Sequence, residues 1–150
     1  IICLLLLTLC ACNALDFDIP EPDAYLRRQV IFPADVAQDQ QLALFTDSRS
    51  ATYWTPSETD IASANRAIYQ HLKTLEESAI TTEFDTYYQQ YFGYQVDDTR
   101  YIYANYFCDT FDFDWRNSFV FVLDGGNCFF QATYNLSTAT VDSLYINGEA

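Results

Sequence analysis

The sequence is poor in several residue types on which catalytic and metal sites depend. It has one histidine, four glycines and five cysteines, and it has no methionine. It contains no HExxH zinc motif, no Gly-x-Gly-x-x-Gly loop, no P-loop and no Cys-x-x-Cys pair. We therefore expect no cofactor, no metal and no catalytic residue, and a non-enzymatic role is favoured. Because position 1 is not methionine, we also expect residues before Ile1 to be missing.

Basic residues are scarce as well. Seven Lys and Arg residues face 21 Asp and Glu residues, which gives a formal net charge of −14. A field of this sign repels nucleic acid and anionic lipid. We expect no nucleic-acid partner, and contact with a membrane only through a lipid anchor. Solubility is the ordinary role of such a charge, and recruitment of a basic partner is the alternative.

Aromatic residues, in contrast, are abundant. Tyr, Phe and Trp make up 17% of the chain, and half of all residues are hydrophobic. This content is sufficient for the core of one domain, and the length leaves no room for a second large one.

The first 14 residues predict a signal peptide. The apolar run of residues 1–9 is too short to cross a bilayer but fits the hydrophobic region of a secretion signal. Leu9-Cys10-Ala11-Cys12 resembles the lipobox of bacterial lipoproteins. This resemblance implies lipidation of Cys12 and anchoring to the bacterial cell envelope. Cleavage after Ala14, giving a secreted or periplasmic protein, is the alternative.

Residues 15–41 predict a flexible acidic tether between this signal and a domain. Its prolines, Pro20, Pro22 and Pro33, interrupt regular strand ladders, and its carboxylates keep the segment solvated. Its one apolar patch, Val30-Ile31-Phe32, is expected to dock on the domain.

Residues 42–150 predict a single α+β domain that contains one long helix. Leu42-Ala43-Leu44-Phe45 favours a short first strand. A helix is expected over residues 56–77, with Thr55 as N-cap, Pro56 at the first position and Glu58 completing a capping box. Its apolar stripe comprises Ile61, Ala64, Ile68, Leu72, Leu75 and Ala79.

Strand patterns fill the remainder of the chain. We expect strands over residues 84–96, 100–107, 119–123, 128–134 and 141–146. Asp97-Asp98 marks a turn, and Asp124-Gly125-Gly126-Asn127 predicts a hairpin. The result is one long helix packed on a curved antiparallel sheet of four to five strands. This element order resembles the cystatin-like and NTF2-like folds, and order alone carries no function.

The last third of the chain also resembles short exported bacterial proteins of uncharacterised function. The resemblance lies in residues 105–108, Asp114-Trp115-Arg116, residues 124–130 and residues 147–150. It implies export and no particular chemistry.

Cys108 and Cys128 are the two cysteines outside the predicted signal peptide. A pair of this kind favours a disulfide in an oxidising compartment. In a plain meander they lie at opposite sheet edges, about 17–20 Å apart, whereas bridged Cα atoms lie about 6 Å apart. The bond therefore requires residues 109–117 to run back along the sheet, or strands that are not sequential neighbours. Otherwise both cysteines serve as small buried hydrophobic residues.

The predicted binding surface consists of tyrosines on the sheet face that the helix leaves uncovered. Its members are Tyr87, Tyr91, Tyr101 and Tyr103. Neighbouring residues of a strand point to opposite faces, so Tyr87 and Tyr88 put aromatics on both. An aromatic and polar platform suits an unknown protein or a glycan.

Three other features favour ordinary structural roles. Residues 109–117 place Asp109, Asp112, Asp114 and Asn117 in one loop, but the pattern lacks the Gly and the bidentate Glu of an EF-type calcium loop. His71 is expected on the surface of the helix or half-buried. Asn135-Leu136-Ser137 is a glycosylation acceptor only in a eukaryotic host.

The favoured function is an exported, envelope-associated binding or structural protein. The alternative is an NTF2-like protein that binds a small ligand, or a hydrolase with a carboxylate such as Asp85 or Asp114 in the concavity of the sheet. A cystatin-like protease inhibitor is a third class, for which no inhibitory loop is identified.

Overall fold

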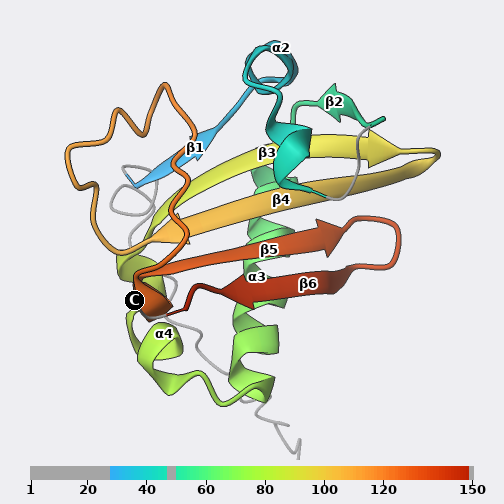
Figure 1. The fold of residues 1–150 in the computed structure, drawn as a ribbon. Coiled ribbons are helices and arrows are strands. Elements are labelled where there is room, and N and C mark those ends of the chain that lie inside the picture. The colour runs from blue at the N-terminus through green and yellow to red at the C-terminus, as the bar shows by residue number, and fades with distance from the viewer. Residues whose placement is uncertain (1–27, 47–49, 149–150) are drawn as a thin grey trace, which may run out of the picture.

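The structure is a computed structural model that describes residues 28–46 and 50–148 (Figure 1). These residues form a mixed α+β fold with an open sheet of six strands and a few helices, the longest of which lies on one face of the sheet. The predicted signal peptide, the lipidation site Cys12 and the first part of the predicted tether lie outside the described residues. No helix in the described part of the chain is long and apolar enough to cross a membrane.

The long helix, α3, spans Glu58–Thr74 and begins two residues later than the sequence predicts. Ser57 is the N-cap. Its hydroxyl accepts from the backbone N–H of Asp60 at 3.2 Å, and its own N–H donates to the Asp60 carboxylate at 2.9 Å. The predicted cap, Thr55, instead accepts from the backbone N–H of Ala34 at 2.9 Å. The Thr55 hydroxyl therefore makes a tertiary hydrogen bond instead of capping the helix.

The apolar stripe of α3 packs on the sheet for four of its six predicted members. Ile61, Ala64, Ile68 and Leu72 are buried. Leu75 is exposed, because the chain leaves the helix at Glu76, which has a φ of 61°. The second helix, α4 (Ser78–Glu83), and the 3₁₀ turn η2 (Phe84–Thr86) then lead into the sheet.

Four antiparallel strands form the body of the sheet. In spatial order they are β3 (Tyr88–Val96), β4 (Thr99–Phe107), β5 (Phe129–Asn135) and β6 (Thr140–Ile146). Two three-residue strands share the outer side of β3. These are the parallel β1 (Gln29–Ile31) and the antiparallel β2 (Thr52–Trp54). Trp54 lies over Gly93, where a Cβ atom would come within 2.6 Å of the indole.

The second half of the predicted tether packs on the sheet. Residues from 28 onward belong to the fold, since β1 pairs with β3, Phe32 is buried, and α2 (Ala34–Asp39) follows. The apolar patch that contains Phe32 docks on the domain as expected. Residues 42–45 form a 3₁₀ turn, η1 (Leu42–Phe45), rather than a strand.

The predicted strand over residues 119–123 and its hairpin at residues 124–127 are also wrong. β4 pairs directly with β5, and the hairpins among the described residues join β3 to β4 and β5 to β6. The backbone groups of the 119–123 segment bond to side-chain amides instead of to a strand. Gln40 accepts from the N–H of Phe119 at 3.0 Å, and Gln90 accepts from that of Val120 at 2.8 Å.

Candidate binding groove

A disulfide closes the loop between β4 and β5. Cys108 and Cys128 are bonded, their Cα atoms lie 4.9 Å apart, and the N–H of Cys108 donates to the carbonyl of Cys128 at 3.0 Å. The bond extends a register in which Phe107 faces Phe129. The predicted disulfide between Cys108 and Cys128 is confirmed. The two cysteines are not at opposite edges of the sheet, because residues 109–127 form a loop and β4 pairs directly with β5.

Gln90 holds the middle of this loop against the sheet. It is fully buried on the face of β3 opposite α3. Its amide nitrogen donates to the carbonyls of Trp115 at 2.6 Å and Ser118 at 2.9 Å, while its oxygen accepts from the N–H of Val120 at 2.8 Å. One buried side chain thus replaces the strand partners that this backbone lacks.

Other amides fix the two sides of the loop. Asn105 donates to the carbonyl of Val120 at 2.8 Å and to the oxygen of Gln90 at 3.1 Å. At the far end, Asn147 donates to the carbonyls of Val122 at 2.7 Å and Asp124 at 3.0 Å. The loop is therefore held by a covalent bond at its ends and by buried amides along its length.

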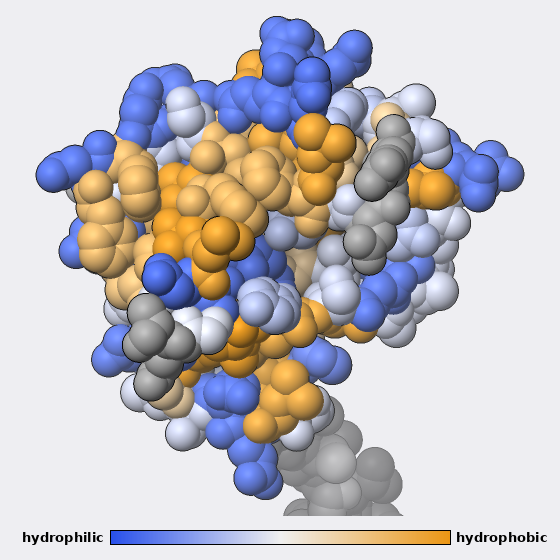
Figure 2. Space-filling view, viewed as in Figure 1, coloured by the Kyte–Doolittle hydropathy of each residue, from blue (hydrophilic) through white to orange (hydrophobic). Residues whose placement is uncertain are grey.

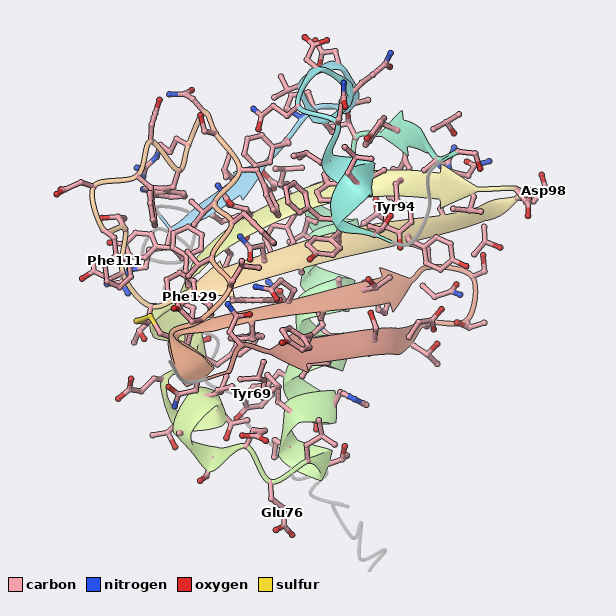
Figure 3. All side chains as sticks on the ribbon, viewed as in Figure 1. Tyr69, Glu76, Tyr94, Asp98, Phe111 and Phe129 are labelled. Carbon is pink, nitrogen blue, oxygen red and sulfur yellow. A yellow bond between two sulfur atoms is a disulfide. The ribbon has the colours of Figure 1, made fainter. Side chains whose placement is uncertain are left out.

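The loop presents apolar side chains to solvent. Phe111, Phe113, Phe121 and Leu123 are all exposed, Phe121 by 56% and Leu123 by 77%. Phe111 and Asp112 have φ values of 47° and 65°, and a positive φ is uncommon for a bulky residue. This turn stacks Phe111 on Phe129 with ring centroids 5.7 Å apart, beside the disulfide (Figure 3). Rigidly held apolar side chains of this kind are typical of recognition surfaces.

A groove of about 540 Å³ lies between this loop and η1, over the sheet face opposite α3. Phe45 and Thr46 line one side, and Phe121, Val122 and Leu123 line another. The strands contribute Tyr94, Val96, Tyr101, Tyr103, Gln131, Ala132, Thr133, Asp142, Ser143, Tyr145 and, just beyond β6, Asn147. In Figure 2, which views this face, hydrophobic residues form a broad patch and hydrophilic residues lie beside it.

Tyr103 gives the groove a hydroxyl that neither accepts nor donates a hydrogen bond within the part of the chain that the structure describes. Its ring stacks on Phe92 with centroids 5.0 Å apart, and its hydroxyl has no hydrogen-bond partner among the described residues. Burial raises the pKa of Tyr103, and the neighbouring Tyr94 raises it further. The hydroxyl therefore stays protonated at neutral pH and is available to a ligand as donor or acceptor.

The tyrosines predicted as one binding surface divide between the two faces. Tyr87 is 4% exposed and Tyr91 is 0% exposed, and both belong to the core beneath α3, so neither can form an exposed surface. Strand alternation explains the burial of Tyr91, which points to the helix. Tyr101 and Tyr103 are half-buried and line the groove. Sequence reasoning missed the loop residues Phe121 and Leu123, because they were assigned to a strand.

The carboxylates of the predicted enzyme alternative lie on the surface. Asp85 belongs to η2 and Asp114 to the loop, and both are exposed. Packed side chains fill the space under α3, where the hydroxyls of Tyr91 and Tyr106 donate to the oxygen of Asn65 at 2.7 and 2.5 Å.

The remaining sequence features have local structural roles. His71 is half-buried in the last turn of α3. Asn117 donates to the carboxylate of Asp114 at 2.9 Å, and in residues 28–46 and 50–148 no three acidic, His or Cys side chains are grouped to hold a metal. Asn135 is buried, and its amide donates to Asp142 at 3.1 Å, so the glycosylation acceptor is engaged within the fold.

Comparisons with family models, with curated proteins and with solved structures find no match.

Proposed function

We propose that this chain is an exported binding protein of the cell envelope, and that it recognises a protein or glycan partner through the groove beside the disulfide-closed loop. The observation that carries the proposal is the exposure of Phe121 and Leu123 on a loop that is fixed at its ends and along its length. Exposed apolar groups are costly to solubility, and rigid placement lowers the entropy lost when they bind.

Export and envelope anchoring are part of the same proposal. Residues 1–14 supply the predicted signal and Cys12 the predicted lipid attachment. The Cys108–Cys128 disulfide is compatible with an oxidising compartment. An anchored chain would present its groove to other components of the envelope surface.

We further propose a cystatin-like or NTF2-like arrangement, with α3 laid across the sheet. An NTF2-like ligand-binding protein or hydrolase is the alternative function, and its cavity would lie between α3 and the sheet. The filled space under the helix favours the binding protein over this alternative. The groove, on the opposite face, contains one described carboxylate, Asp142.

Site-specific photo-crosslinking in the cells that make the protein tests the proposal. A photoreactive amino acid replaces Leu123 in one variant and Glu76, an exposed residue far from the groove (Figure 3), in the control. We expect a single dominant adduct from position 123, identified by mass spectrometry, that excess purified chain suppresses. Equal labelling from both positions, or none from position 123, would contradict a binding role for the groove.

A further inference from the structure

The two edges of the sheet differ in how their backbone groups are paired. One side of β3 is covered by the three-residue strands β1 and β2. At the other edge, the seven-residue β6 pairs with β5 on one side, and none of the described residues pairs with its other side (Figure 1). Every second residue of such an edge directs its backbone N–H and C=O outward, where they can pair with another chain.

This free edge is continuous with the groove. Asp142, Ser143 and Tyr145 of β6 line the groove, and Tyr145 is 62% exposed. The hydrogen bonds of Asn147 hold residues 122–124 beside the end of the strand, which places Leu123 near the edge. A strand added to β6 would therefore extend the groove floor and lay alternate side chains against Tyr145 and Leu123.

Charge selects among the occupants of this site. None of the described groove residues is basic, Asp142 lies in the lining, and Asp124 follows Leu123 at the end of the loop. The loop itself carries Asp109, Asp112, Asp114 and Asp124 against one basic residue, Arg116. An anionic ligand would be repelled, and a segment bearing lysine or arginine would be attracted.

Resting on the proposed function, we infer that the partner is an extended polypeptide segment with both apolar and basic side chains, which pairs with the free edge of β6. Its backbone completes the hydrogen bonds of the edge, its apolar side chains pack on Tyr145 and Leu123, and its cations face Asp142 and Asp124. A second copy of this chain is disfavoured as the occupant, because the formal charge of each chain is −14.

Two synthetic peptides test this inference with the full chain. Both have seven residues, the length of β6; one alternates lysine with valine, and the other alternates glutamate with valine. We expect the lysine peptide to bind at least ten-fold more tightly, to weaken as salt is raised, and to protect the amides of residues 140–146 from hydrogen exchange. Asp142→Asn and Leu123→Ala should each weaken binding several-fold, whereas Glu76→Gln should leave it unchanged.

Three results would overturn the inference. These are equal binding of the two peptides, protection that falls outside β6, or a dimer of the free chain that protects the same strand. If position 123 crosslinks to a partner in cells while the lysine peptide fails, the edge-pairing inference falls and the proposed binding role stands. If both experiments fail, the binding role falls as well.

Discussion

The two faces of the sheet are built from the same strands but are covered in different ways. Under α3, helix and strands bury apolar and aromatic side chains around Tyr106 and Phe130, whose rings stack with centroids 4.3 Å apart. On the opposite face, a loop of irregular backbone is held by the side-chain amides of Gln90, Asn105 and Asn147. One face is closed by packing, and the other is closed in part by polar contacts that leave a groove.

The difference separates stability from recognition. A face closed by packing gains free energy from every apolar contact and has little freedom to change. On the opposite face, Trp115 and Val120 of the loop are buried against Phe107 and Phe129. Side-chain amides fix the rest of the loop, so its other apolar side chains can stay exposed. Substitutions on the two faces should therefore have different consequences for stability and for binding.

The same substitution placed on each face gives the strongest contrast. Phe130→Ala empties a fully buried site that contacts Tyr106, Tyr87 and Phe84, and should lower the free energy of unfolding by about 3–5 kcal/mol. Phe121→Ala removes a ring that is 56% exposed, and should change it by less than about 0.5 kcal/mol. Urea unfolding of both variants measures the difference. Similar losses would show that the groove face contributes to the core as much as the helix face does.

Removing the disulfide tests how far the loop depends on its covalent closure. Cys108 and Cys128 are 20 residues apart, and the double variant Cys108→Ser with Cys128→Ser should lose about 3 kcal/mol through the entropy of the unfolded chain. Urea unfolding of the double variant against the oxidised parent gives the number. A loss below about 1 kcal/mol would mean that the amide contacts and the packing of Trp115 and Val120 are enough to close the loop.

The helix face was largely predictable from the sequence, because its periodicities are local. A stripe at steps of three and four marks α3, and alternation marks β4 almost to the residue. Both patterns depend on neighbours within a few positions. Local patterns do not reveal the hydrogen bond between Thr55 and Ala34. The predicted helix start is therefore two residues too early.

The groove face was not predictable in the same way. Residues 119–123 have the composition of a strand, yet their backbone bonds to Gln40 and Gln90. Both glutamines are distant in sequence, and no local pattern indicates that their side chains bind this backbone. Composition indicates that a segment is apolar, and it does not indicate which groups satisfy its backbone. The disulfide was the one long-range contact that residue counting alone could favour.

Replacing Gln90 tests whether its side chain holds the loop against the sheet. Gln90→Ala leaves the carbonyls of Trp115 and Ser118 and the N–H of Val120 without their partner, and should cost about 1–3 kcal/mol. Hydrogen exchange should accelerate in the loop more than in β3 to β6. Gln95→Ala is the matched control, since Gln95 lies on the same strand and its amide bonds within the hairpin, to the carbonyl of Asp97. Equal acceleration in both variants would show that Gln90 has no special role.

Two tyrosines, one from each face, give the finest comparison. Burial raises the pKa of Tyr87, with a further contribution from the Glu83 carboxylate, and burial raises that of Tyr103 on the groove face. Since the fold favours the protonated form, the unfolded chain releases these protons first. Stability should be constant below about pH 10, the pKa of an unperturbed tyrosine, and fall as the pH rises above it.

Phenylalanine variants separate the two contributions. Tyr87→Phe removes a hydrogen bond of 2.7 Å to the carbonyl of Asn127 and should cost about 1 kcal/mol at pH 7. Tyr103→Phe removes a hydroxyl that has no partner among the described residues, and should cost less than about 0.5 kcal/mol. Both should flatten the loss of stability above pH 10, measured by urea unfolding at pH 7 and pH 11. If Tyr103→Phe proved the costlier change at pH 7, the hydroxyl would be a structural group of the groove face, and its availability to a ligand would have to be given up.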